Sequence, residues 1–223
     1  MKLLKVALLL AAASIASYAG TISGCGTCQG GVYSLTYSTV STNVSGMDTY
    51  NLFLSINDSG LNIAGYSLSQ IYIGAVAPKI TATNPAGETQ TLIIGPGGAA
   101  NWTTVQGGIS AGGCSANGGG FICSTPTTVP GLAAASNGTN SWQWQVSLPT
   151  GTALLLGNVG AADAASLKVQ YTDASGNKIG ALVSESINLT STTATPEPST
   201  YAMMALGLGG LGLAGRLRRS RNS

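Results

Sequence analysis

The sequence of 223 residues contains no histidine, and this absence excludes several kinds of catalytic site. Serine and cysteine nucleophiles that rely on a histidine base cannot form, and neither can metal-hydrolase sites with histidine ligands. Paired carboxylates that hydrolyse glycosidic bonds need no histidine, so a hydrolase of that type is the remaining enzymatic alternative. Six acidic residues could contribute to such a pair: Asp48, Asp58, Glu88, Asp163, Asp173 and Glu185. Because Asp58 and Asp173 stand in glycine-containing turns, where aspartate serves the backbone, we predict that the protein is not an enzyme.

Charged residues are also scarce, at 7% of the chain, and arginine occurs only within the last eight residues. Between residues 20 and 195, three lysines stand against the six acidic residues, which gives this part a formal net charge of −3. These lysines are Lys79, Lys168 and Lys178. A weakly acidic surface without arginine is poorly suited to hold a run of phosphates, so we predict that nucleic acid is not a partner.

The C-terminal stretch has three parts in a fixed order. Pro196, Glu197 and Pro198 come first, and an apolar run without charge follows over residues 201–215. The arginines then close the chain: Arg216, Arg218, Arg219 and Arg221. Because the prolines fix φ and lack backbone donors, the segment before the apolar run should be extended. We predict a hydrophobic helix over residues 199–217, with the arginines on the cytoplasmic side and the body of the chain outside.

An ordinary membrane anchor is the alternative interpretation of this tail. At 1.5 Å per residue, an apolar helix of about 15 residues spans roughly 22 Å, which is short of a hydrocarbon core of about 30 Å. Five glycines weaken the helix further: Gly207, Gly209, Gly210, Gly212 and Gly215. A temporary membrane segment therefore fits these residues better than a permanent anchor.

The tail resembles the PEP-CTERM sorting signal of Gram-negative bacteria, because the Pro-Glu-Pro sequence, the hydrophobic segment and the arginine cluster all occur in the family's order. In that family the signal is read by exosortase, a membrane transpeptidase-like enzyme that cuts near the Pro-Glu-Pro sequence. The resemblance implies that residues 195–221 are a sorting signal and that exosortase recognises Pro196–Pro198. It also implies an intermediate tethered to the inner membrane, followed by release to the cell surface or the exterior.

A matrix role follows from the same resemblance. Proteins of this class tend to occur in bacteria that make extracellular polysaccharide. The resemblance therefore implies a structural protein of the cell surface or the extracellular matrix, with exopolysaccharide as a partner.

The first 19 residues are typical of a secretory signal peptide. Lys2 and Lys5 supply the positive start, residues 6–16 form the apolar region, and Ser17-Tyr18-Ala19 places small residues at the two positions that cleavage requires. We predict that signal peptidase cuts between Ala19 and Gly20, with an uncleaved N-terminal anchor as the alternative. The exported body, residues 20–194, is then long enough to form one domain with its own core.

Apolar and polar residues alternate through most of this body. Apolar residues occupy every second position at Tyr33, Leu35 and Tyr37, and they do so again over residues 49–57 and 141–148. Residues 167–183 have the pattern of a β-hairpin with a turn at 173–177. No segment shows sustained helical periodicity. We predict an all-β fold, an antiparallel β-sandwich with Greek-key or immunoglobulin-like connections as one form of it. A glycine-rich solenoid is the alternative, but no fixed repeat supports it.

Four cysteines in an exported chain favour disulfides, because the periplasm is oxidising. Cys114 and Cys123 flank an eight-residue loop that a bridge would close. Cys25 and Cys28 form a C-x-x-C pair in a predicted loop, and we favour a structural disulfide there, either local or crossed with the other pair. A zinc site would need all four cysteines because histidine is absent, and a redox pair is the third interpretation.

Two tryptophans raise the question of a carbohydrate-binding surface. Trp142 and Trp144 could stack on sugars together with five tyrosines: Tyr33, Tyr37, Tyr50, Tyr66 and Tyr72. However, tryptophans at alternate positions beside Val146 and Leu148 are typical of the buried face of a strand. We therefore favour a core position, and keep a carbohydrate-binding module as the second function and a hydrolase as the third.

Asp173, Ser175 and Asn177 alternate like the ligands of a calcium loop. The bidentate acidic residue that completes such a loop is missing, so a simple turn is favoured. We predict no cofactor for this protein.

Overall fold

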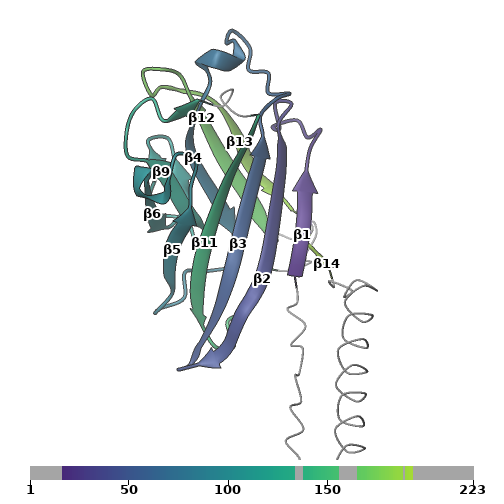
Figure 1. The fold of residues 1–223 in the computed structure, drawn as a ribbon, viewed down its shortest axis with the longest axis vertical. Helices are drawn as coiled ribbons and strands as arrows, with labels where there is room; N and C mark the ends of the chain where they lie inside the picture. The colour runs from purple at the N-terminus through teal and green to yellow at the C-terminus, as the bar shows by residue number, and fades with distance from the viewer. Residues whose placement is uncertain (1–16, 134–137, 156–164, 188, 193–223) are drawn as a thin grey trace, which may run out of the picture. The chain divides into compact units, whose positions relative to one another are not determined.

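The computed structural model describes residues 17–133, 138–155, 165–187 and 189–192. The chain divides into two units, Met1–Thr192 and Thr193–Ser223, and all described residues belong to the first. They form two main sheets in which every strand pairing is antiparallel (Figure 1). The predicted all-β, antiparallel fold is confirmed. The predicted C-terminal helix and the first sixteen residues lie outside the described residues.

One sheet has six strands in the order β14-β1-β2-β3-β11-β5. Their bounds are Ser17–Ile22 for β1, Val32–Val44 for β2, Met47–Asn57 for β3, Thr89–Ile94 for β5, Thr139–Pro149 for β11 and Thr190–Thr192 for β14. A two-residue turn joins β2 to β3, and both of its residues, Ser45 and Gly46, have positive φ (55° and 76°). Such turns match the twist of the flanking strands, which explains the tight hairpin here.

The second sheet has five strands in the order β13-β12-β4-β9-β6, and the short β10 also pairs with β4. Their bounds are Tyr72–Lys79 for β4, Trp102–Gln106 for β6, Ile122–Pro126 for β9, Leu132–Ala133 for β10, Ser166–Thr172 for β12 and Lys178–Ser186 for β13. A small separate hairpin consists of β7, Ile109–Ser110, and β8, Gly113–Cys114. Two single turns of 3-10 helix, η1 at Leu68–Gln70 and η2 at Ala99–Asn101, are the helical elements among the described residues.

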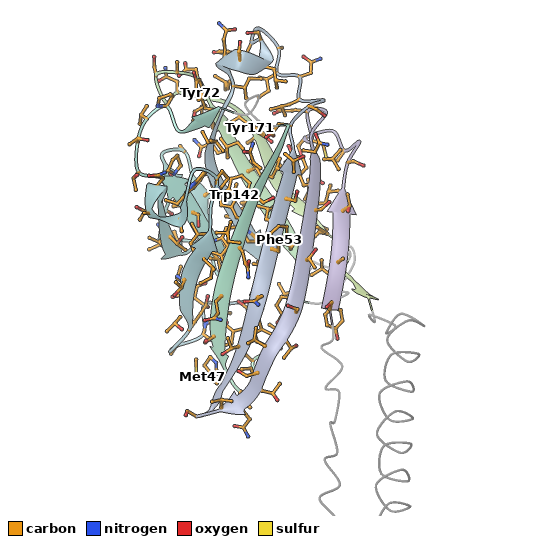
Figure 2. All side chains as sticks on the ribbon, in the orientation of Figure 1. Met47, Phe53, Tyr72, Trp142 and Tyr171 are labelled. Atoms are coloured by element: carbon orange, nitrogen blue, oxygen red, sulfur yellow. A yellow bond between two sulfur atoms is a disulfide. The ribbon has the colours of Figure 1, made fainter. Side chains whose placement is uncertain are left out.

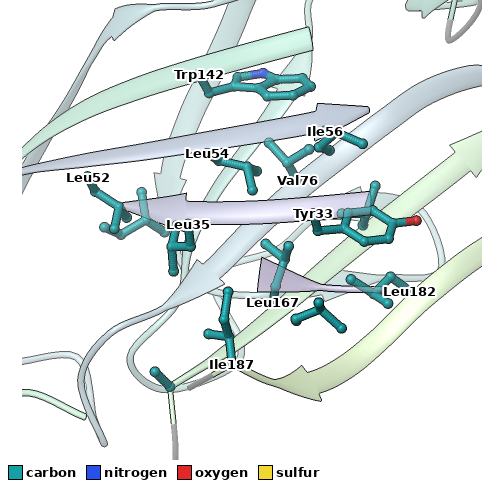
Figure 3. Close-up of a cluster of buried hydrophobic side chains, with 14 of the residues drawn as sticks. Tyr33, Leu35, Leu52, Leu54, Ile56, Val76, Trp142, Leu167, Leu182 and Ile187 are labelled. Carbon is teal, nitrogen blue, oxygen red and sulfur yellow. The ribbon is translucent and has the colours of Figure 1, made fainter. Parts of the chain in front are cut away.

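The main core lies between the two sheets, and Figure 3 shows part of it. The first sheet contributes Leu54 and Ile56 from β3, and the second contributes Val76 from β4 and Leu167 from β12. Each fully buried aliphatic side chain of this kind contributes about 1.5–3 kcal/mol relative to an exposed one. The alternation seen in the sequence therefore determines which face of each strand is buried.

The predicted Greek-key connection is not found among the first four strands. β1, β2 and β3 are consecutive neighbours, but β4 pairs in the other sheet, so these four strands do not adopt the order 4-1-2-3 in one sheet. The strand beside β1 is instead β14, from the last described residues.

The first strand begins before the predicted start of the mature chain. β1 includes Ser17, Tyr18 and Ala19, which the sequence assigns to the signal peptide, and it continues through Gly20 to Ile22. The predicted cut between Ala19 and Gly20 therefore falls in the middle of a paired strand.

Candidate functional site

All four cysteines are in local disulfides, Cys25 with Cys28 and Cys114 with Cys123. The predicted pairing of Cys114 with Cys123 is confirmed, and the local alternative holds for the other two cysteines. A four-cysteine zinc site does not fit, since its thiolates would have to be free. The Cys25–Cys28 pair lies before β2 and not at the start of a helix, where a thioredoxin-type redox pair would lie.

The Cys114–Cys123 disulfide attaches the β7–β8 hairpin to β9. A second, small apolar cluster lies under this hairpin, with Ala75 and Ala77 of β4 packed against Phe121 and Cys123. Close approach of the backbone explains two glycines near this hairpin, because a Cβ at Gly107 or Gly120 would collide with the carbonyl oxygen of Ser115 or Thr81. The disulfide therefore fixes the β7–β8 hairpin over the outer face of the five-stranded sheet. We call this element the stapled hairpin.

The described acidic residues are spread over separate elements of the fold. Each of the five described carboxylates has its own hydrogen-bond partners, and none of the five is bonded to another in the part of the chain that the structure describes. They lie on different elements: Asp48 at the start of β3, Asp58 just after its end, Glu88 before β5, Asp173 in the β12–β13 turn and Glu185 near the end of β13. Asp163 lies outside the described residues. The absence of enzymatic activity stays a prediction.

The calcium-like sequence around Asp173 forms an ordinary turn. The Oδ1 atom of Asp173 accepts hydrogen bonds from the backbone N–H groups of Ser175 (2.8 Å) and Asn177 (2.9 Å), and Oδ2 accepts one from the Asn177 side chain (3.0 Å). These hydrogen bonds lower the pKa of Asp173, and the bond from the Asn177 side chain contributes most to the shift. Both carboxylate oxygens therefore serve the turn, as the sequence suggested.

The tryptophans belong to the core. Trp142 and Trp144 are 0% exposed, and the Trp142 ring meets the Trp102 ring edge-on with their centroids 5.3 Å apart. The indole N–H of Trp144 donates to the Ser124 hydroxyl at 2.8 Å, so its one polar atom is satisfied inside the sandwich. A sugar-stacking surface built on these two tryptophans is therefore wrong, because no ligand can reach them.

Three of the five tyrosines in that hypothesis are buried as well: Tyr33, Tyr37 and Tyr50. Tyr66 and Tyr72 are partly exposed, but the two tryptophans that they would have joined are buried.

The three lysines of the body, in contrast, gather around the stapled hairpin. The Nζ atoms of Lys168 and Lys79 lie 4.4 Å and 5.8 Å from the centroid of the Phe121 ring. Lys168 also lines a groove beside the hairpin together with Lys178. The electron-rich face of Phe121 attracts both ammonium groups and holds them near each other.

None of these three lysines forms a salt bridge with a described carboxylate. Burial lowers the pKa of Lys168, and the nearby charge of Lys79 lowers it further. Two cations thus share one aromatic ring, and no described carboxylate forms an ion pair with either of them. Such an arrangement attracts anionic groups from solution, because a bound carboxylate would offset the repulsion between the ammonium groups.

The groove beside the hairpin has a volume of about 230 Å³. Ile109 and Ala111 form one side of it, residues 181–183 form the other, and Lys168 and Lys178 place cations along it. We call this site the lysine groove. Sequence reasoning counted these lysines only toward net charge, since positions on three different strands carry no local signal that they meet.

On β2, β3 and β11, the outer face of the six-stranded sheet carries no ionisable side chain. Most residues that alternate with the core positions there have hydroxyl or amide side chains. The apolar exceptions include Val32 and Phe53, each 37% exposed, and Phe53 is labelled in Figure 2. Those that point outward from the middle of the sheet are Ser34, Thr36, Asn51, Phe53, Ser55, Ser141, Gln143 and Gln145. The two outer faces of the protein therefore differ in charge.

A family model described as the PEP-CTERM protein-sorting motif matches residues 194–219. The match includes Pro196–Pro198 and the first three arginines of the basic cluster, while Arg221 lies beyond it. It confirms the resemblance of the tail, although these residues lie outside the described part of the structure. No curated protein and no solved structure matches the chain. Among the described residues, no helix is both long and apolar enough to cross a membrane.

Proposed function

Since the chain is an exported protein that carries a PEP-CTERM sorting motif and is sorted by exosortase, we propose that its β-sandwich is a structural component of the extracellular matrix. In this proposal the lysine groove binds carboxylate groups of an acidic exopolysaccharide. The observation that carries it is that Lys168 and Lys178 line one groove, while Lys79 shares the Phe121 ring with Lys168, and none of the three is paired with a described carboxylate.

The chemistry of the groove suits an acidic sugar. Lys168 and Lys178 can each donate charge-assisted hydrogen bonds to a carboxylate, while the aliphatic sides can contact the C–H groups of a sugar ring. A neutral polymer would leave the cations unpaired. A nucleic acid would need a more extended basic surface than three lysines provide.

A single groove of this kind binds weakly. An exposed ion pair contributes about 0–1 kcal/mol, so one sugar unit at one groove would dissociate readily. A polymer with a carboxylate on each repeating unit engages many protein copies at once, and the combined binding is much stronger. Weak individual contacts and strong collective ones are suited to a matrix component.

Export and sorting complete the proposed sequence of events. Signal peptidase and exosortase act on the two ends of the chain, and a membrane-tethered intermediate carries the arginine cluster until exosortase removes it. The sandwich then reaches the cell surface or the exterior, where the polysaccharide is. The intact mass of the protein recovered from its native host, fraction by fraction, tests this order of processing.

Binding to polygalacturonate, a uronic acid polymer, tests the ligand. We expect the exported protein to bind it at low salt and to release it as the salt concentration rises, because exposed charges are screened. The substitution Lys168→Gln should weaken binding about fivefold, and Lys168→Gln with Lys178→Gln more than either alone. Phe53→Ala, on the opposite outer face, is the control that should bind like the wild type.

Dextran, a neutral glucan, is the matched control ligand. Equal binding of dextran and polygalacturonate, or unchanged binding by the double lysine variant, would contradict the proposal. Dextran binding that is lost in Phe53→Ala would instead assign glycan recognition to the uncharged face of the six-stranded sheet.

A further inference from the structure

The first half of β1 is paired on both of its edges. On one side β1 pairs with β2 without a register shift, from Ser17 opposite Ser38 to Ile22 opposite Tyr33. On the other side Ser17, Tyr18 and Ala19 pair with the three residues of β14. The residues just before the predicted cut are therefore an interior part of the six-stranded sheet.

We infer that signal peptidase cuts between Ala16 and Ser17, so that the mature protein keeps Ser17, Tyr18 and Ala19 as the first half of β1. This position differs from the cut between Ala19 and Gly20 that the sequence suggests. It concerns the N-terminal processing of the chain and is independent of any ligand of the lysine groove.

Backbone pairing is the first argument. β14 pairs with Ser17–Ala19 and with no other described strand, so a cut after Ala19 would leave β14 without its partner. The same cut would also unpair β2 from Thr36 to Ser38 and expose those backbone groups as an open edge. Exposed edges of this kind favour aggregation of a sheet with other chains, which native proteins avoid.

Side-chain packing is the second argument. The centroids of the Tyr18 and Tyr37 rings lie 6.2 Å apart. The Tyr37 ring in turn stacks on the Tyr50 ring, with their centroids 5.0 Å apart. Tyr37 is buried, and Tyr18 packs against the main core. A cut after Ala19 would remove Tyr18 and uncover this end of the aromatic row.

The sequence permits the earlier cut equally well. Signal peptidase requires small residues at the last and third-last positions before the cut. Ser14 and Ala16 satisfy that rule, as Ser17 and Ala19 do. The enzyme acts before the domain folds, so the strand does not direct the cut, but the pairing indicates which residues the folded domain includes.

The earlier cut has a consequence for the other end of the domain. β14 ends at Thr192, and the matched sorting motif begins at residue 194. With Ser17–Ala19 retained, the chain that leads into the motif stays paired at the edge of the sheet. With these residues removed, the same segment would have no strand to hold it.

N-terminal peptide mapping of the exported full-length protein, by mass spectrometry, tests the inference. We expect the mature chain to begin at Ser17. A mature chain that begins at Gly20 would overturn the inference and leave the polysaccharide proposal untouched.

Two matched variants make the same test from the side of the substrate. Ala16→Leu places a large residue before the inferred cut, so the precursor should accumulate or the cut should move. Ala19→Leu alters a partly exposed position of β1 and should leave the N-terminus at Ser17. The reverse pattern, with processing blocked by Ala19→Leu and unaffected by Ala16→Leu, would assign the cut to Ala19.

Discussion

The hydroxyl of Tyr33 on β2 lies 2.8 Å from the hydroxyl of Tyr171 on β12, and this hydrogen bond links the two sheets inside the core. Tyr33 also donates to the backbone carbonyl of Cys28 at 3.1 Å, so Tyr171 is the group that donates to Tyr33. Burial raises the pKa of Tyr33 to about 12, which keeps this hydroxyl protonated at physiological pH. The pair therefore connects the Cys25–Cys28 loop, the first sheet and the second sheet.

The substitution Tyr171→Phe should reduce the free energy of unfolding by about 1–2 kcal/mol, because it removes a buried hydrogen bond without removing the ring. Urea denaturation measures this change. Tyr66→Phe, at an exposed position, is the control and should have no measurable effect. Equal stability of Tyr171→Phe and the wild type would show that the link contributes nothing.

Asp58 should make the protein less stable as the pH rises. The residue is 0% exposed, its Oδ2 accepts a hydrogen bond from the Asn140 side chain at 2.8 Å, and its Oδ1 has no partner. Burial raises its pKa from 3.8 to about 7, although the Asn140 bond opposes the shift. Because the folded state favours the protonated form of Asp58, the protonated carboxyl contributes to the stability of the fold. This stabilisation is fully present below pH 4 and is lost between about pH 4 and 7.

The variant Asp58→Asn should remove this pH dependence. At pH 8 it should exceed the wild type in stability by up to about 4 kcal/mol, and below pH 4 the two should be similar. Urea denaturation at both pH values measures the difference. Asp173→Asn is the control of opposite sign: its lowered pKa means that the wild-type carboxylate stabilises the fold above pH 4, so this variant should lose stability at pH 8. A constant difference between Asp58→Asn and the wild type at all pH values would contradict the assignment.

The Cys114–Cys123 disulfide should determine both stability and the shape of the lysine groove. Closing a loop of about ten residues stabilises a fold by about 3 kcal/mol in the chain-entropy view, so replacing both cysteines by serine should lower stability by about that amount. The same variant should bind polygalacturonate more weakly, since the hairpin forms one side of the groove. Cys25→Ser with Cys28→Ser is the control for loss of a disulfide elsewhere, and it should leave binding intact. If both double variants bind equally well, the hairpin does not shape the site.

Local sequence patterns were sufficient to predict the strand faces, one disulfide and the sorting motif of this protein. The alternation around Trp142 and Trp144 correctly placed both side chains in the core, because a strand presents every second residue to the same face. The short separation of Cys114 and Cys123 correctly indicated a bridge. The sorting motif could also be read directly, since an enzyme recognises it as a contiguous segment.

The tertiary structure decided the features that depend on residues far apart in the chain. It brought β14 beside β1, it gathered Lys79, Lys168 and Lys178 around Phe121 and the stapled hairpin, and it buried Asp58 deeply enough to raise its pKa. None of these has a local signature, because strand partners, converging charges and the polarity around a carboxylate depend on which sheet edges and faces meet. The sequence by itself therefore determined the sorting signal, the strands and the buried face of each strand. The packing of the two sheets determined where the charged side chains and the first strand lie.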